Sequence, residues 1–216
     1  MPDNALLDAP FDYDHFERCA EHIITASADI YQRGWSPATS SNYSVRLNAD
    51  SCAITVSGKH KSALSLHDVM AVDLRGQPLM PHKPSAETLL HTQLYRRDTN
   101  IGAVLHTHSV CATVLSMEMT ADTIKLQGYE LLKAFSDVTT HDTTLHIPIF
   151  DNTQNMLELS ADVEKRMLRD GTGIAYLIRG HGLYIWAENL PACMRQLEAL
   201  EFLLDSEWRR MCLRRG

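Results

Sequence analysis

The stretch Ile101-Gly102-Ala103-Val104-Leu105-His106-Thr107-His108 is an apolar run that ends in two histidines separated by one residue. A short apolar run of this kind is typical of a buried strand. Successive side chains of a strand point to opposite faces, so His106 and His108 share one face and Thr107 takes the other. The sequence therefore predicts a buried strand that brings two imidazoles to one point.

A third histidine stands in the later segment Arg179-Gly180-His181-Gly182-Leu183, between strands expected at residues 175–178 and 183–187. Glycines on both sides of His181 allow close approach of backbone and leave room around the ring. Three imidazoles leave the fourth position of a zinc ion open, which is the arrangement of a catalytic site. We therefore expect His106, His108 and His181 to be metal ligands, although the same imidazoles also accept other divalent ions.

The rest of the chain predicts helices mixed with short strands. Apolar periodicity and turn residues place helices at 14–33, 85–97, 110–117, 129–135 and 160–168, and further strands at 43–47, 53–56, 69–74 and 145–150. Asn189 is a good N-cap for a last helix, whose apolar stripe is Cys193, Leu197, Leu200, Leu204, Trp208 and Met211. The stripe indicates core packing or, as a second option, a subunit contact. This order predicts one α/β domain over residues 1–216, a three-layer α/β/α arrangement whose mainly antiparallel central sheet has helices on both faces.

Composition narrows the class of protein. The net charge of −7 argues against a nucleic-acid partner, because such proteins normally carry a basic patch. Neither an apolar signal segment nor an apolar stretch of membrane-spanning length is visible, so no membrane association is expected. The five cysteines are widely scattered and form no C-x-x-C, which predicts a reducing, cytoplasmic location.

Two glutamates are candidates for moving protons next to such a metal. Glu87 follows Lys83-Pro84-Ser85-Ala86, and Glu130 lies in Gln127-Gly128-Tyr129-Glu130-Leu131. Either glutamate is equally explained as an acid in the first turn of a helix, where it stabilises the helix dipole.

Two small polar loops, residues 38–44 and 55–59, have the hydroxyls, amide and turn N–H groups that hold an anion such as phosphate. The same residues are also ordinary turn formers. The histidines at 15, 22, 67, 82, 91 and 141 have no partner at a metal-ligand spacing, and we expect them to be surface or core residues.

Together these segments resemble the class II aldolase family of zinc-dependent sugar-phosphate enzymes. The recurring elements appear in the family's order as Ser41-Asn42-Tyr43-Ser44, Thr55-Val56-Ser57-Gly58, Ser85-Ala86-Glu87, His106-Thr107-His108 and Gly180-His181-Gly182. The resemblance covers residues 12–208. It implies a class II aldolase-like fold, a zinc ion on the three histidines, and phosphate contacts from Asn42, Ser57, Gly58 and Ser85. Ser41 stands where the family usually has glycine, which puts the shape of the phosphate loop in question.

Within the family, the segments 84–91, 127–133 and 147–154 are most similar to the dehydratases of methionine salvage, which act on methylthioribulose 1-phosphate. This similarity implies one Zn²⁺ per subunit, Glu130 as the acid/base group, and a homotetramer with active sites near subunit contacts. Glu87 falls where the aldolases place their acid/base glutamate. A sugar-phosphate aldolase or 4-epimerase is thus the nearest alternative. A non-enzymatic scaffold like the adducin head is a further one, but that domain lacks the zinc histidines.

Overall fold

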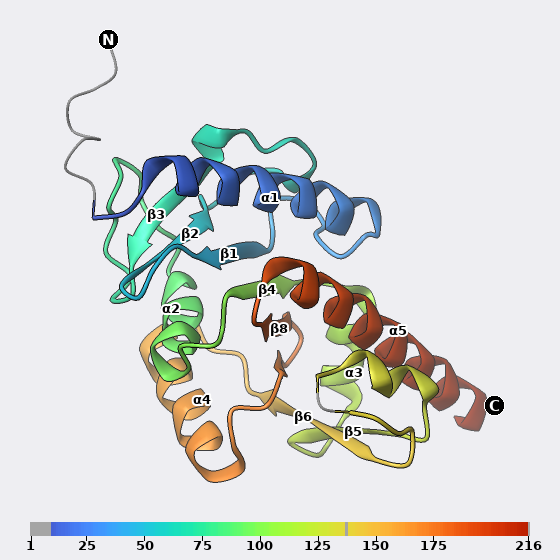
Figure 1. Cartoon of the computed structure of the whole chain (residues 1–216). Helices are drawn as coiled ribbons and strands as arrows, with labels where there is room; N and C mark the ends of the chain where they lie inside the picture. Colours follow the sequence, from blue (N-terminus) through green and yellow to red (C-terminus); the bar gives the residue numbers. More distant parts are fainter. Residues whose placement is uncertain (1–9, 137, 216) are drawn as a thin grey trace.

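The computed structural model describes residues 10–136 and 138–215, and its helices and strands are arranged as in Figure 1. The strands are β1 (Asn42–Arg46), β2 (Ser51–Thr55), β3 (Val69–Asp73), β4 (Ala103–Thr107), β5 (Thr123–Gln127), β6 (Thr144–Phe150), β7 (Ala175–Ile178) and β8 (Gly182–Ala187). The α-helices are α1 (Tyr13–Gln32), α2 (Thr88–Arg97), α3 (Val110–Glu118), α4 (Met156–Asp170) and α5 (Leu190–Arg215). Short 3₁₀ helices are η2 (Lys61–Ala63), η3 (Leu66–Asp68) and η4 (Glu130–Ala134).

The eight strands form one sheet in the order β3-β2-β1-β4-β8-β7-β6-β5. Every neighbouring pair is antiparallel except β6 and β7, which run parallel. The mainly antiparallel sheet predicted from the sequence is therefore confirmed. The strand that carries His106 and the strand that follows His181 are direct neighbours at the centre of this sheet.

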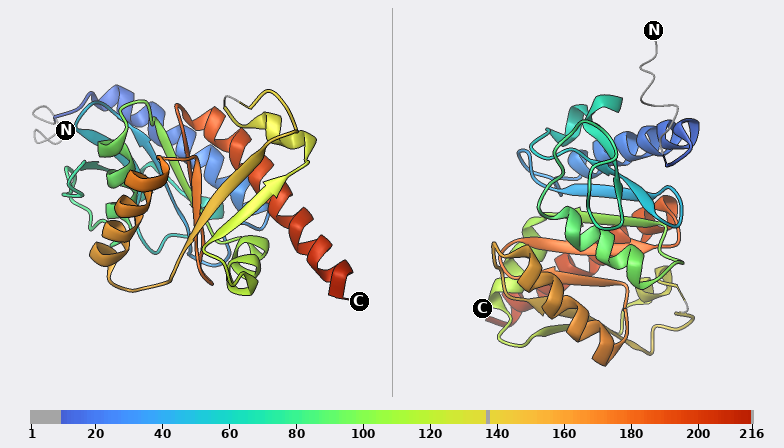
Figure 2. Two further views of the ribbon diagram at one scale, coloured as in Figure 1. Left: turned by 90° about the horizontal axis from the view of Figure 1, so that it is seen from below. Right: turned by 90° about the vertical axis from the view of Figure 1, so that its left-hand side faces the viewer.

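Helices cover both faces of the sheet, so the three-layer arrangement is also confirmed. Side chains of α1, α3 and α5 share one buried core with one face of the sheet, and side chains of α2 and α4 share the second core with the other face. Figure 2 shows α2 and α4 on the opposite side of the sheet from α5. Along β4, Ala103 and Leu105 enter the first core and Val104 the second. By this alternation His106 lies on the α2 face and Thr107 on the α5 face.

The helix termini and the apolar stripe follow the sequence signals closely. Asp12 caps α1 by accepting hydrogen bonds from the first-turn amides, and Ser109 caps α3 in the same way. The stripe of α5 packs into the core, with its first four members fully buried and Trp208 and Met211 half-buried against it. Core packing was therefore the correct interpretation of that stripe.

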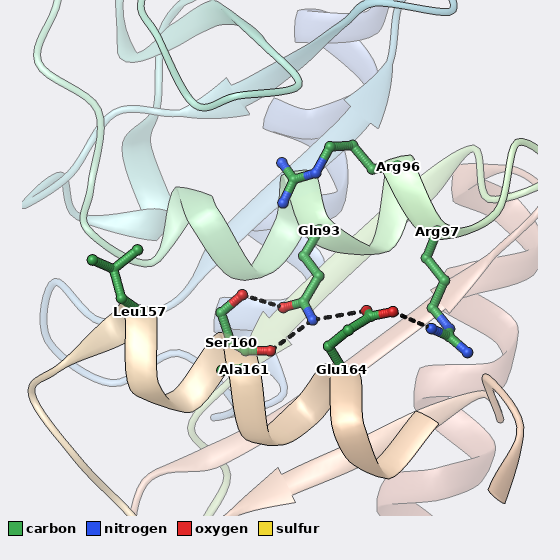
Figure 3. A pocket seen from close by; sticks show the side chains of 7 residues that line it. All are labelled: Gln93, Arg96, Arg97, Leu157, Ser160, Ala161 and Glu164. Carbon is green, nitrogen blue, oxygen red and sulfur yellow. Dashed lines mark hydrogen bonds and ion pairs between the residues drawn. The ribbon is translucent and has the colours of Figure 1, made fainter. Parts of the chain in front are cut away.

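Polar side chains join α2 to α4 across a surface cavity, shown in Figure 3. The Gln93 amide donates to the Ser160 carbonyl (2.8 Å) and accepts from the Ser160 hydroxyl (2.8 Å). Arg97 forms an ion pair with Glu164 (2.6 Å). These bonds fix α2 against α4 and thereby position the N-terminus of α2, where Glu87 lies.

Several elements differ from the sequence prediction. α4 begins at Met156 rather than at residue 160. β5 was not predicted, although its buried residues Ile124 and Leu126 alternate with exposed ones. The helix expected at 129–135 is the 3₁₀ helix η4, and α2 begins at Thr88 rather than at Ser85. No helix in the described part of the chain is long and apolar enough to cross a membrane.

Candidate metal centre

His106, His108 and His181 converge at one end of the central strands. Their candidate ligand atoms all lie within 4.8 Å of one another. The Nε2 atoms of His106 and His108 are 2.8 Å apart, and the ring centroids of His108 and His181 are 4.6 Å apart. The sequence expectation that two strand-end imidazoles and a distant histidine meet is thus reproduced in the structure.

The orientation of the His106 ring has a structural cause. His106 is fully buried and its Nδ1 donates to the Leu183 carbonyl (2.8 Å), which leaves the lone pair of Nε2 directed at the other histidines. Its ring also stacks on Tyr184, with centroids 4.1 Å apart. A hydrogen bond to the far nitrogen is the usual way in which a protein orients a metal-ligating histidine.

Close packing of β8 on the end of β4 brings the third histidine in. A Cβ atom at Gly182 would lie 2.0 Å from the Thr107 carbonyl oxygen, so only glycine allows this approach. Gly180, on the other side of His181, adopts a left-handed backbone with φ of 66°. Both glycines of the Gly-His-Gly segment are therefore required by the backbone.

Burial keeps the imidazoles of His106 and His108 neutral. Burial lowers the pKa of His106 well below its ordinary value. Burial, together with the nearby His181, lowers the pKa of His108 to about 4. Neutral imidazoles with converging lone pairs are the donor set that Zn²⁺ and similar divalent ions prefer, so these residues fit a bound metal.

Glu87 is the carboxylate that lies against the histidines. One of its oxygens is 3.2 Å from His181 Nε2 and 3.8 Å from His106 Nε2, and the other accepts from the Asn42 amide (2.5 Å). Burial opposes ionisation of Glu87, but the hydrogen bond of His181 and the neighbouring imidazoles lower its pKa well below the ordinary value. The arrangement combines three candidate metal ligands with an ionised carboxylate beside them.

Glu130 lies elsewhere on the chain surface. Its side chain on η4 is 73% exposed and pairs with Lys133 (2.5 Å) and His141 (3.6 Å). Among the contacts of the described residues, none joins Glu130 to the three histidines of its own chain.

The residues expected at a phosphate divide into two groups. Ser57 and Gly58 are exposed and form the turn after β2, and the register of β1 with β2 places that turn just beyond Asn42. Asn42 is buried, and its side-chain amide is engaged by His91 and Glu87. Ser85 is half-buried and its hydroxyl accepts from the Glu87 amide (3.3 Å).

The departure at Ser41 has a visible consequence. Ser41 adopts φ of 73°, the left-handed region in which the glycine usual at this position is unstrained. Its hydroxyl accepts from Ser36 (3.0 Å), a hydrogen bond that glycine cannot make. The loop therefore keeps the conformation that a glycine would favour.

Sequence reasoning assigned no role at the site to Ser44, His91 and Tyr95, which lie beside Glu87 and Asn42. Glu87, His91 and Tyr95 are spaced by four, so they share one face of α2. Asn42 and Ser44 share one face of β1. Both faces meet, and His91 is bonded to Asn42 and to Ser44 (2.7 Å). The spacing of four from Glu87 was the available signal.

Lys61 is a further buried group close to this centre. Its ammonium donates to the Lys59 carbonyl (2.8 Å), and burial lowers its pKa to about 8, against the opposing charges of Glu87 and Asp68. The charge of Lys61 also contributes to the lowered pKa of His108. Lys61 and Lys59 together make the second polar loop locally positive.

Comparison with known proteins identifies the family. The model of the family described as "Class II Aldolase and Adducin N-terminal domain" matches residues 21–208. The chain belongs to the class II aldolase family. The resemblance seen in the sequence is thereby confirmed.

Two relatives more than 50% identical to this chain have the same name. A methylthioribulose-1-phosphate dehydratase of Alcanivorax borkumensis is 55% identical over 200 residues, covering 93% of this chain and 95% of the relative. A protein of the same name from Pseudomonas fluorescens is 54% identical over 192 residues, covering 88% and 92%. Among solved structures, the L-fuculose-1-phosphate aldolase of Thermus thermophilus superposes with a TM-score of 0.73 at 23% identity, covering 93% of this chain and 99% of that one. That last similarity concerns the class II aldolase fold alone.

Proposed function

We propose that this chain is a zinc-dependent hydro-lyase. Its reaction would be the dehydration of 5-methylthioribulose 1-phosphate to 5-methylthio-2,3-dioxopentyl phosphate, a step of methionine salvage. The observation that carries the proposal is the convergence of His106, His108 and His181 beside the ionised Glu87. The names of relatives more than 50% identical over about nine tenths of the chain support the choice of substrate.

The three histidines would hold one Zn²⁺ per subunit. A divalent ion in that position supplies a Lewis acid that polarises the oxygens of a bound sugar. Asn42, Ser57, Gly58 and Ser85, together with the positive charge of Lys61, would bind the phosphate and so hold the reacting carbons in place. Ser57 and Gly58 are exposed enough to be reached by a ligand from solvent.

Dehydration requires removal of the C3 proton, which is adjacent to the C2 ketone, and departure of the C4 hydroxyl as water. In the proposed scheme the Glu130 carboxylate removes the C3 proton and then returns a proton to the leaving C4 oxygen. Loss of water leaves an enol, which becomes the 2,3-diketone. Glu87, next to the imidazole nitrogens, would accept a hydrogen bond from a hydroxyl of the bound sugar.

The position of Glu130 is reconciled with this role if the active site lies at a subunit contact, as the family resemblance implies. We propose that the chain forms a homotetramer and that Glu130 serves the histidines of a neighbouring copy. Its side chain is 73% exposed and therefore accessible to a neighbouring copy. The same assembly would cover exposed apolar side chains such as Val110 and Phe202, which are 71% and 58% exposed.

Mixing two inactive variants tests this arrangement. A Glu130→Gln protein and a His106→Ala/His108→Ala protein are co-expressed with different affinity tags, and assemblies that contain both tags are isolated. Hybrids recover activity if each site combines the histidines of one copy with Glu130 of another. Hybrids as inactive as either parent would refute a shared site.

The reaction itself is tested by incubating the zinc-loaded protein with methylthioribulose 1-phosphate and determining the molecular mass of the product. Loss of one water supports the dehydratase. Two fragments would instead identify an aldolase, with Glu87 as its acid/base group; the contact of Glu87 with the triad is the observation that favours this second function. In that case Glu87→Gln abolishes turnover and Glu130→Gln does not.

A further inference from the structure

A chain of buried hydrogen bonds runs from α2 through β1 to Glu87. The Tyr95 hydroxyl lies 2.8 Å from Ser44 Oγ, which lies 2.7 Å from His91 Nδ1. His91 Nε2 bonds to Asn42 Oδ1, and Asn42 Nδ2 donates to Glu87 Oε2 (2.5 Å). Tyr95, Ser44, His91 and Asn42 are all at most 5% exposed, so water does not compete for these bonds.

Secondary structure holds four of the five groups, and the fifth, Glu87, is the N-cap residue of α2. His91 and Tyr95 lie one turn apart on one face of α2, Glu87 precedes His91 by one turn at the N-cap, and Asn42 and Ser44 lie on one face of β1. Two rigid elements therefore present complementary rows of polar side chains, and each group meets its neighbour in order along both rows.

The chemistry of the groups fixes the direction of every proton. A carboxylate only accepts, so the Asn42 amide nitrogen faces Glu87 and the Asn42 oxygen faces His91. His91 must then donate from Nε2. Complete burial lowers the pKa of His91 to about 3, so its ring is neutral and Nδ1 is an acceptor. Ser44 donates to that Nδ1 and in turn accepts from the Tyr95 hydroxyl.

The opposite direction leaves one proton without an acceptor. A protonated Glu87 would donate to Asn42, the amide and the His91 tautomer would both reverse, and Ser44 would donate to Tyr95. Among the contacts of the described residues, the Tyr95 hydroxyl has only Ser44 as a partner, so its own hydrogen would then be buried and unpaired. A buried donor without an acceptor is strongly unfavourable.

We propose that His91 is a positioning residue for Glu87: in its Nε2–H form, aligned by Ser44 and Tyr95, it holds the Asn42 amide so that one oxygen of Glu87 accepts from that amide and the other oxygen is directed at the histidines. This inference rests on the proposed function for the role of Glu87 in turnover, but its hydrogen-bond geometry is independent of the reaction. Replacing His91 would therefore change catalysis without touching the substrate or the three imidazoles.

Nitrogen NMR tests the geometry directly, without substrate. In protein labelled with ¹⁵N in its histidine rings, with and without zinc, the His91 signals are assigned by their loss in His91→Gln. The expected result is a neutral ring protonated at Nε2. A ring protonated at Nδ1, or a charged ring at pH 7, would overturn the proposal. Ser44→Ala removes the donor to Nδ1 and is expected to shift the ring toward the other tautomer; an unchanged tautomer would count against the role of Ser44 and Tyr95.

Steady-state kinetics tests the effect of His91 on catalysis. His91→Leu removes both ring nitrogens and is expected to lower kcat by ~10–100-fold, the usual effect of an orienting partner, with KM changed far less and zinc content unchanged. His91→Gln keeps a donor for Asn42 and should recover most of kcat. Thr92→Val is the matched control and should keep the wild-type kcat. Thr92 is the next buried residue of α2, and its hydroxyl bonds to Leu89 and Arg96 of the same helix.

Equal kcat in His91→Leu and wild type, or a His91→Gln protein as impaired as His91→Leu, would refute the positioning role. If His91→Leu does not fold, the comparison of Ser44→Ala with Thr92→Val takes its place. If the protein turns out to cleave a sugar phosphate rather than dehydrate it, the tautomer result stands unchanged, so failure of the proposed function and failure of this inference are separate outcomes.

Discussion

Gly182 determines how near His181 can come to the other two histidines. Replacement by alanine would place a Cβ atom against the Thr107 carbonyl, so β8 must move away from the end of β4. We predict that Gly182→Ala lowers both the melting temperature and the zinc bound per chain, measured by thermal unfolding and metal analysis, because His181 moves with β8.

Gly171→Ala is the matched control for this prediction. Gly171 ends α4 with φ of 90° and ψ of 165°, and nothing lies within 4 Å of its missing Cβ. Alanine there costs about 1–3 kcal/mol through backbone strain alone, so stability falls while zinc content stays. A Gly182→Ala protein that binds zinc like the wild type would show that β8 can retreat without moving His181.

At the scale of single residues, the sequence was sufficient wherever a residue type has one strong preference. The His-x-His pair, the glycines around His181 and the cap Asn189 all follow from local chemistry. His91 could not be recognised in this way, because a lone histidine gives no signal until β1 and α2 are known to face each other. Glu130 shows the converse: its proposed role came from family resemblance, and its own chain leaves it on the surface.

At the scale of elements, periodicity predicted the long helices and the central strands within a few residues. β5 was missed because only two of its five side chains are buried, and such a short alternation is a weak signal for a strand. Register was beyond local reasoning altogether. The pairing of His106 with Tyr184 brings His181 next to His106 and His108. It depends on contacts between residues 78 positions apart in the chain.

The packing of α5 against β4 carries a pH-dependent prediction. Glu201 of α5 is 3% exposed and accepts from Thr107 (3.2 Å), the residue between the two strand histidines. Burial raises the pKa of Glu201 to about 7, despite the hydrogen bonds from Ser109 and Thr107. The pKa of Glu201 is higher in the folded chain than in the unfolded chain. Its contribution to folding stability is therefore complete below about pH 4.5 and is lost as the pH rises through 7.

We therefore predict that Glu201→Gln, which cannot ionise, is more stable than the wild type at pH 8 and that this advantage disappears near pH 4.5. At about 1.4 kcal/mol per pKa unit, the difference at pH 8 is roughly 3 kcal/mol. Urea unfolding from pH 4.5 to 8 measures it, and the acid end serves as an internal control. A stability difference that does not change with pH would show that Glu201 ionises freely while folded.

At the scale of the whole molecule, the sheet, its two helical layers and the strand-end site form one system, so a ligand of the site should stabilise the entire fold. Metal that binds only the folded chain increases the free energy of unfolding by RT ln(1 + [L]/Kd). This is about 2.7 kcal/mol when the free zinc concentration is one hundred times Kd. For a chain of this size each kcal/mol raises the melting temperature by about 2–4 °C, so we predict a rise of roughly 5–10 °C when zinc is added to metal-free protein. The His106→Ala/His108→Ala variant lacks two of the three ligands and should show no such rise at the same zinc concentrations. An equal rise in that variant would mean that zinc acts at another place on the folded chain, and the three histidines would then have to be explained without a metal.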